Sequence, residues 1–135
     1  MTNTAQDKLN FAFASSDQIH LDQHLGKCQS LAIYSVTPNG SEHIKTVHLS
    51  HDEGHNQQKI NERLSALQDC FVVYCLACGN PVRQQLLAQG TRVVVNSAAV
   101  PIAQLIPKIQ ENWPGKVALR QKKQLKKQQA DDYLS

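Results

Sequence analysis

The sequence predicts an α/β fold in which helices cover a mixed five-stranded sheet. Cys70–Leu76 is apolar almost throughout, as expected for a central strand. Ser30–Thr37 and Glu42–Ser50 are strand patterns on either side of the turn sequence Pro-Asn-Gly-Ser, which predicts an antiparallel hairpin. A strand–helix–strand unit near the end of the domain requires parallel pairing through a right-handed crossover. Because both kinds of pairing are expected, the sheet is predicted to be mixed.

The first half of the chain adds a strand, a loop and a helix to the hairpin. Asn10–Ser15 is predicted to be a short buried strand, and the polar segment Ser16–Lys27 a loop. A helix is expected to run from about Asn56, a plausible N-cap, to Gln68. Its predicted buried stripe consists of Ile60, Leu64 and Leu67.

The second half supplies the parallel strands and two more helices. Pro81 suits the first turn of a helix that ends at Gln89, with Gly90 as its stop. Thr91–Asn96 is the predicted fifth strand. Pro101 starts the last helix, which Pro107 could kink. Its apolar residues with helical spacing are Ile102, Leu105, Ile106, Ile109 and Trp113.

Length and composition predict one globular domain with polar ends. The chain has 135 residues, of which 41% are hydrophobic and 19% charged. No apolar run approaches the roughly 20 residues of a membrane span, and the polar N-terminus lacks the apolar region of a signal peptide. A cytoplasmic location is therefore expected. The predicted organisation is a flexible N-terminus over 1–9, one globular domain over 10–114 and a basic tail over 115–135.

The positive charge is concentrated in the tail. The formal net charge is +3, but up to Pro114 the chain has 8 Lys and Arg against 9 Asp and Glu, a net of −1. This distribution argues against a nucleic-acid-binding core. The tail is interpreted as a flexible arm, and docking to nucleic acid or to an acidic protein is the alternative. Its basic residues are Lys116, Arg120, Lys122, Lys123, Lys126 and Lys127.

The segment Ser15–Gly26 is the leading candidate for a binding site. It follows a buried strand, at the sheet edge where ligand sites of open α/β sheets usually lie. It carries two imidazoles, His20 and His24, together with two carboxylates and two hydroxyls, and Cys28 follows. Neutral imidazole is a common ligand of iron and other transition metals. On spacing alone, a surface loop whose polar side chains satisfy its own backbone is the simpler interpretation.

Cys75 and Cys78 form a Cys-x-x-Cys where a strand meets a helix. Thioredoxin-like proteins keep their redox pair at such a junction, so a thiol-disulfide oxidoreductase is the alternative function. Gly79–Pro81 separates the pair from the helix, which differs from that pattern. Cys70 and Cys75 are most simply core thiols, whereas Cys78 could face the same crevice as His24 and ligate a metal.

The other polar clusters suggest binding rather than catalysis. His48, His51 and His55 could chelate zinc, but a polar connection before a helix is the favoured interpretation. The sequence has no Gly-rich phosphate loop, no Gly-x-Ser-x-Gly and no His-Glu-x-x-His. A non-catalytic role is therefore expected.

Several of these segments together resemble the NifX/NafY family of nitrogenase iron–molybdenum cofactor carriers. Phe11–Asp17 and then Asp22–Gly26 are similar to the family's "ASSD…QHFG" stretch. Ile33–Val36 matches its second strand, and the run from Ile60–Cys70 to Gly79 is similar to its central helix and strand. The resemblance covers about residues 10–113. It is nearest to the NifX branch, because no extra N-terminal domain precedes the core.

The resemblance implies a three-layer ribonuclease H-like fold and a non-catalytic carrier. The cargo it implies is the iron–molybdenum cofactor or its iron–sulfur precursor, bound during cofactor biosynthesis. His24 is implied to be the cluster ligand. Leu25 stands where the family usually has Phe, which leaves the cluster preference open. The other expected cofactor-binding residues are Ser15, Ser16, Asp17 and Gly26, and Cys28 and Cys78 are secondary metal ligands.

This implied function is consistent with the chemistry of the cargo. One imidazole and several loop N–H groups could hold a bulky anionic cluster reversibly, whereas a full set of thiolates would hold it too firmly for a carrier. Lys27 and Arg83 are candidates for added positive potential. The expected partners are cofactor assembly scaffold proteins and apo-dinitrogenase, with no nucleic acid and no membrane, and the chain is expected to be a monomer.

Overall fold

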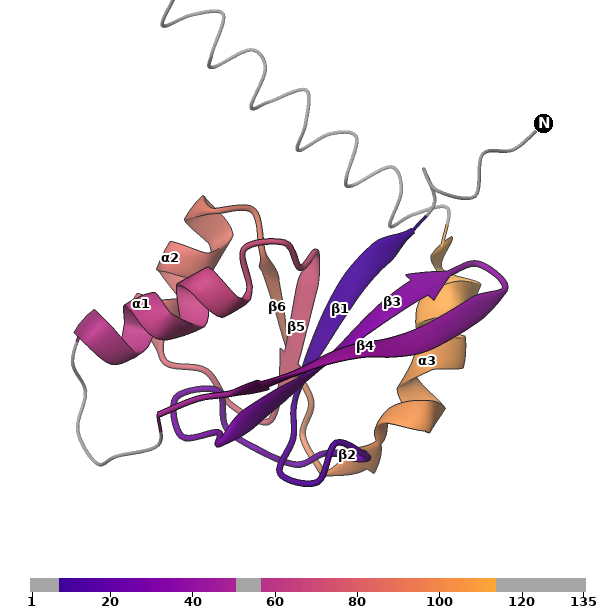
Figure 1. The fold of residues 1–135 in the computed structure, drawn as a ribbon, viewed down its shortest axis with the longest axis horizontal. Helices are drawn as coiled ribbons and strands as arrows, with labels where there is room; N and C mark the ends of the chain where they lie inside the picture. The colour runs from indigo at the N-terminus through magenta and orange to yellow at the C-terminus, as the bar shows by residue number, and fades with distance from the viewer. Residues whose placement is uncertain (1–7, 51–56, 114–135) are drawn as a thin grey trace, which may run out of the picture.

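The computed structural model describes residues 8–50 and 57–113, and its main feature is a mixed five-stranded sheet between helices (Figure 1). This architecture confirms the predicted fold class. The elements in chain order are β1 (Leu9–Ala14), β2 (His20–Leu21), β3 (Ser30–Thr37), β4 (Gly40–His48), α1 (Gln57–Ala66), β5 (Val72–Cys75), α2 (Asn80–Ala88), β6 (Arg92–Val95), β7 (Val100–Pro101) and α3 (Ile102–Glu111).

The strand order of the main sheet is β4-β3-β1-β5-β6. The hairpin β3–β4 and the pair β1–β3 are antiparallel, and the pairs β1–β5 and β5–β6 are parallel. The carboxyl ends of β1, β5 and β6 therefore meet at one edge of the sheet, which we call the loop edge. The segments Ser15–Gln29 and Leu76–Gly79 leave the sheet there.

The sheet is the middle of three layers. α1 and α2 cover one face and α3 covers the other (Figure 1). The predicted apolar stripe of α3 is buried throughout. Phe11 of β1 is fully buried and stacks on Trp113, with ring centroids 6.3 Å apart. Aromatic rings from the central strand thus join the sheet to α3.

The structure adds a two-stranded ladder within the segment predicted to be an irregular loop. His20 pairs with Pro101, and Leu21 pairs with Val100. The Ile102 N–H also donates to the Ile19 carbonyl at 2.9 Å. Strands of two residues carry no periodic pattern, so the sequence could not indicate them. The ladder ties the middle of the loop to the start of α3.

Helix α1 differs from its prediction in what it buries. Leu67, just after the helix, is fully buried, but Leu64 and Ile60 are only partly buried. The buried helical residue is Arg63, whose exposed fraction is 1%. The predicted N-cap Asn56 lies outside the described residues.

Helix α2 follows its prediction closely. Pro81 lies in its first turn, and Gly90 follows its C-terminal cap with a φ of 96°. A positive φ is the conformation that favours glycine after a helix.

In the two described stretches of chain, no helix is long and apolar enough to cross a membrane.

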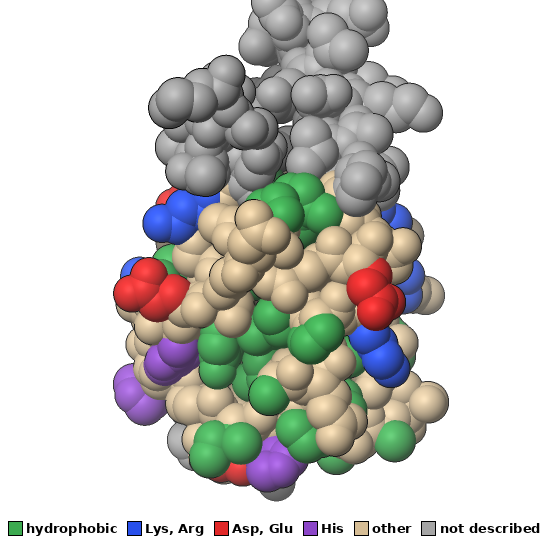
Figure 2. Space-filling view, turned by 90° about the vertical axis from the view of Figure 1, so that its right-hand side faces the viewer, with side chains coloured by type: hydrophobic (Ala, Val, Ile, Leu, Met, Phe, Trp, Pro, Cys, Tyr) green, Lys and Arg blue, Asp and Glu red, His purple; other side chains and the backbone are tan. Residues whose placement is uncertain are grey.

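Figure 2 shows the side of the molecule on which α3 lies. Hydrophobic side chains, interspersed with backbone and other uncharged atoms, fill the middle of this face, and charged side chains lie toward its borders. The histidines visible on it lie in its lower half, the end at which Figure 1 shows the loop edge.

Candidate functional site

The first part of the candidate loop is organised around the Asp17 carboxylate. Asp17 Oδ1 accepts hydrogen bonds from the amides of Ile19 and His20, each at 2.8 Å. Asp17 Oδ2 lies 2.7 Å from Nδ1 of His20. The backbone hydrogen bond from His20, and then the side-chain one, hold the pKa of Asp17 well below its ordinary value of 3.8.

The two serines of the loop also bond to loop residues. Ser15 Oγ donates to Asp17 Oδ1 at 3.2 Å and accepts from the Gln18 amide at 2.9 Å. Ser16 Oγ donates to Asp22 Oδ2 at 2.5 Å, and the Ser16 amide donates to Asp22 Oδ1 at 2.9 Å. These contacts match the interpretation in which polar side chains satisfy their own loop. Cofactor binding by Ser15, Ser16 and Asp17 stays a prediction.

Gln18 holds the loop against the sheet, a role not predicted from the sequence. Its φ of 67° is the left-handed conformation, which is uncommon for residues other than glycine. Its amide nitrogen donates to Ser30 Oγ at 2.9 Å, and its amide oxygen accepts from Thr46 Oγ1 at 2.9 Å. These partners are distant in sequence, so a local pattern could not have indicated the contact.

We expect Asp17→Asn to lower the free energy of unfolding at pH 7. The substitution removes the carboxylate charge of Asp17. That charge favours the contact with the His20 ring and the hydrogen bonds from the Ile19 and His20 amides. Because the folded-state pKa of Asp17 is depressed, this contribution is present above the ordinary value of 3.8 and is lost as the pH falls below it. Urea unfolding at pH 7 and pH 3 checks this. The difference in the free energy of unfolding between variant and wild type should be smaller at pH 3 than at pH 7. A difference independent of pH would contradict the stabilising role of the Asp17 charge.

His24 presents its imidazole to solvent at the loop edge. The residue is exposed, and within the described parts of the chain its side chain makes no hydrogen bond or ion pair. Its neighbours are held in place: the Leu25 amide donates to the Ala77 carbonyl at 2.9 Å, and the Gln23 carbonyl accepts from the Leu76 amide at 2.9 Å. A fixed backbone thus carries an exposed imidazole beside the end of β5.

Two amides next to this imidazole are also open. Among the described residues, no acceptor receives the N–H of His24 or of Gly26. A Cβ added at Gly26 would meet nothing within 4 Å, so there is open space beside that glycine. An imidazole and backbone N–H groups together can contact an anionic metal cluster.

Cys78 lies beside this site on the neighbouring segment. It is half-buried, and its Sγ donates to the Gly79 carbonyl at 3.5 Å. A hydrogen bond from Cys75 lowers the pKa of Cys78, and the charge of Arg83 adds to this effect. Arg83 therefore adds positive potential at Cys78.

Cys28 is placed less favourably for metal binding. It is fully buried, and its Sγ donates to the Leu25 carbonyl at 3.2 Å. Burial raises its pKa to about 11, so its thiol stays protonated at neutral pH. In the part of the chain that the structure describes, no three His, Cys, Asp or Glu side chains are grouped to hold one metal ion.

The other thiols and histidines have simpler positions. Cys70 and Cys75 are buried, which confirms them as core thiols. Burial raises the pKa of Cys70 to about 12. His48 is exposed on β4, while His51 and His55 lie outside the described residues.

We expect Cys78 to react first with iodoacetamide in the native protein at pH 8. It is the most accessible of the four cysteines, and its lowered pKa increases the fraction of reactive thiolate. Mass spectrometry of timed samples measures the order of reaction. Under denaturing conditions all four cysteines should react at similar rates. Faster native labelling of Cys28 than of Cys78 would contradict the assigned burial.

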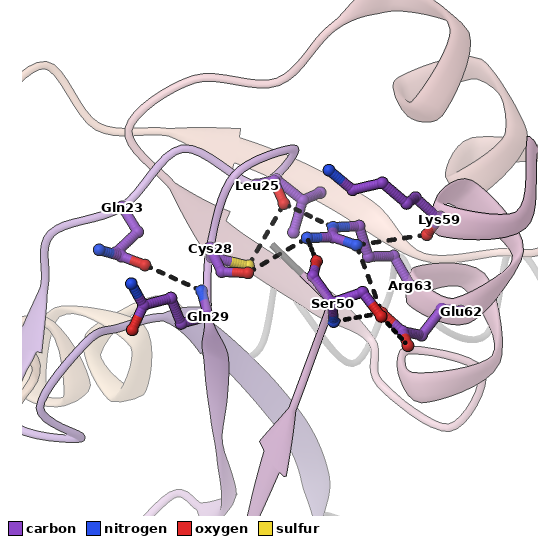
Figure 3. Close-up of polar contacts among 8 residues, drawn as sticks. All are labelled: Gln23, Leu25, Cys28, Gln29, Ser50, Lys59, Glu62 and Arg63. Atoms are coloured by element: carbon purple, nitrogen blue, oxygen red, sulfur yellow. Dashed lines mark hydrogen bonds and ion pairs between the residues drawn. The ribbon is translucent and has the colours of Figure 1, made fainter. Parts of the chain in front are cut away.

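Arg63 of α1 anchors the second half of the loop to the helical layer (Figure 3). Its Nε donates to the Leu25 carbonyl at 2.8 Å, and its Nη2 donates to the Cys28 carbonyl at 3.1 Å. Its remaining acceptors are the carbonyls of Ser50 and Lys59. Arg63 was not predicted from the sequence, because an arginine beside an apolar stripe is usually solvated.

These features define an α/β domain that presents an exposed histidine on an anchored loop at the loop edge of a mixed sheet. The family profile described as "Dinitrogenase iron-molybdenum cofactor" matches residues 7–112. The chain belongs to this family.

Curated relatives support this membership. The chain is 37% identical to "Protein NifX" of Klebsiella pneumoniae over 113 residues, which covers 84% of this chain and 72% of the relative. It is 38% identical to "Protein NifX" of Azotobacter vinelandii over 103 residues, 76% of this chain and 65% of that relative. The match to the latter thus spans slightly less than two thirds of its length.

Solved structures support the fold. The crystal structure of PH0822 superposes with a TM-score of 0.61 at 14% identity, over 77% of this chain and 90% of the other. The crystal structure of a candidate dinitrogenase from Methanocaldococcus jannaschii gives a TM-score of 0.56 at 10% identity, over 78% and 91%. At such low identity the likeness concerns the fold alone.

Proposed function

We propose that this protein acts in nitrogenase cofactor biosynthesis as a non-catalytic carrier of the iron–molybdenum cofactor or its iron–sulfur precursor. Family membership supports the cargo class, and the NifX relatives support the nitrogen-fixation context. The observation that carries the proposal is His24, an exposed imidazole without a protein partner among the described residues, on an anchored loop. A side chain so placed is available to an incoming cluster at no cost in broken contacts.

The surroundings of His24 suit a bulky anionic cargo that must later be released. The open amides of His24 and Gly26 can donate to the cluster, and Arg83 and the exposed Lys27 add positive charge. Cys78, with its lowered pKa, is the better placed of the two proposed secondary ligands. A single strong ligand with weaker supporting contacts allows the cargo to be handed on.

The test is anaerobic loading with isolated iron–molybdenum cofactor. After incubation and gel filtration, the protein fraction should contain iron and molybdenum in the ratio of the added cofactor, with a broad visible absorption. Electron paramagnetic resonance should report a changed cluster environment. A protein fraction free of both metals, beside an albumin control run identically, would reject the mature cofactor as the cargo.

The partners and the location follow from this role and are proposals too. A carrier receives its cargo from a cofactor assembly scaffold protein and delivers it to a further assembly protein or to apo-dinitrogenase. Those events take place in the cytoplasm, and a monomer with one His24 site suffices for them.

A thiol-disulfide oxidoreductase is the second candidate, favoured by the interacting Cys75 and Cys78 thiols. The lowered pKa of Cys78 resembles that of an attacking thiol, whereas Cys75 is buried with a raised pKa. Equilibration in redox buffers followed by thiol titration separates the two functions. A pair that forms no disulfide at any accessible potential eliminates the oxidoreductase.

A further inference from the structure

The Arg63 side chain is a buried cation whose hydrogen bonds go to backbone carbonyls of separate segments. Its exposed fraction is 1%, although charged side chains are rarely buried to this degree. One neighbouring carboxylate, Glu62, lies 3.6 Å from Nη1 and is itself partly exposed. Charge neutralisation is therefore not the main use of this guanidinium. Its short contacts are with neutral oxygens.

The acceptors of Arg63 belong to the loop, to the end of the hairpin and to its own helix. The Leu25 and Cys28 carbonyls lie on either side of the turn Gly26–Lys27, at 2.8 Å and 3.1 Å. The Ser50 carbonyl, just beyond β4, accepts at 3.0 Å. Figure 3 shows these oxygens converging on one planar group. Two of the four carbonyls belong to Leu25, which directly follows His24, and to Cys28, three residues further along the chain.

From this geometry we infer that Arg63 is the positioning residue of the His24 site, an inference that rests on the proposed carrier function. It binds the carbonyls of Leu25 and Cys28 on the inner side of the turn. The peptide groups of the turn are thereby oriented, and the amides of His24 and Gly26, which have no acceptor among the described residues, stay available. Arg63 does not touch the cargo and acts through the loop.

Glu62 extends the same anchor to the hairpin. Its carboxylate accepts from the Ser50 amide at 2.7 Å and from Ser50 Oγ at 3.0 Å. The Ser50 carbonyl in turn accepts from Arg63. Glu62 and Arg63 of α1 thus bind the amide and the carbonyl of Ser50. The candidate loop and the end of the hairpin are therefore both anchored to α1.

Lysine cannot reproduce this arrangement. The guanidinium directs its N–H groups in a fixed planar fork, whereas an ammonium is a compact point charge on a flexible stem. Arg63→Lys keeps the positive charge but replaces the fork, which reaches four carbonyls, with three donors on a single atom. It therefore tests the fork separately from the charge. Arg92→Lys, at the opposite end of the sheet, is the matched control.

Hydrogen exchange tests the anchor without any cargo. In Arg63→Lys, exchange of the Leu25 and Lys27 amides should accelerate at least about tenfold, while the Phe71 amide at the far end of the sheet changes little. In Arg92→Lys the loop amides should keep the wild-type rates. Acceleration by the same factor at all three amides would mean a general loss of stability and would overturn the inference.

The wild-type protein gives a second measurement in case the variant folds poorly. The Nε–H of Arg63 donates to a buried carbonyl, so in nuclear magnetic resonance spectra its exchange with water should be at least about tenfold slower than that of the exposed Arg83. Equal rates for the two groups would overturn the inference.

Cluster binding separates this inference from the proposed function. With isolated iron–molybdenum cofactor as the probe, Arg63→Lys should weaken binding by about 10-fold to 100-fold, as for residues that orient a metal ligand. Binding unchanged in Arg63→Lys but lost in His24→Ala would overturn the role of Arg63 and leave the carrier function standing. Unchanged binding in both variants would remove the cargo site from this loop, and with it the function assigned to Arg63.

Discussion

His24→Ala is expected to abolish most of the cluster binding and leave the fold intact. Loss of a residue that merely orients a metal ligand costs about 10-fold to 100-fold in affinity, so loss of the ligand itself should cost at least about 100-fold. Because His24 is exposed, the free energy of unfolding should change by no more than about 0.5 kcal/mol. Visible absorption and iron content after anaerobic loading measure the binding.

His48→Ala is the control for this prediction. His48 is an exposed histidine on β4, outside the candidate loop, so its loss should leave cluster uptake at the wild-type level. If His24→Ala took up as much iron and molybdenum as wild type, His24 would lose its assigned role. Cys78 would then be the next ligand to replace.

Phe11→Ala is expected to destabilise the protein by about 3–5 kcal/mol, as for other fully buried phenylalanines. Phe11 has an exposed fraction of 0% in the central strand of the sheet. Its ring contacts Trp113 at a centroid distance of 6.3 Å and Phe71 at 6.1 Å. Truncation would leave a cavity between the sheet and α3. Since small domains are stable by only about 5–15 kcal/mol, much of the native stability would be lost.

Urea unfolding followed by far-ultraviolet circular dichroism measures this loss. Leu87→Ala is the matched control: Leu87 lies on α2 with an exposed fraction of 51%, so its truncation should change stability by about 0.5 kcal/mol or less. A loss below 1 kcal/mol for Phe11→Ala would contradict the role assigned to its ring.

Most of the fold was predictable because its elements have local signals. Ser30–Thr37 was predicted with the observed bounds, and α3 buries the predicted apolar stripe. Pro81 and Gly90 mark the ends of α2 because each has a particular backbone requirement. The β2–β7 ladder was missed, since strands of two residues are defined by a partner far along the chain.

The candidate site was predictable only in part. The loop and His24 were found through residue types and the family resemblance, and the structure places Cys78 on the adjacent segment. The anchors Gln18 and Arg63 were missed because most of their side-chain hydrogen-bond partners lie 12 to 38 residues away in the sequence. Local periodicity reports which helical positions are apolar. It carries no information about a buried polar side chain whose partners come from tertiary contacts.

The stacked pair Phe11–Trp113 has a consequence for how the protein could be handled. It places the start of β1 and the end of α3 together at the end of the sheet opposite the loop edge (Figure 1). A fluorophore or a surface tether attached at either of these points would lie at the end of the sheet away from His24. The protein could then be immobilised with its loop open, and the transfer of cargo between a donor and an acceptor could be followed on one anchored molecule.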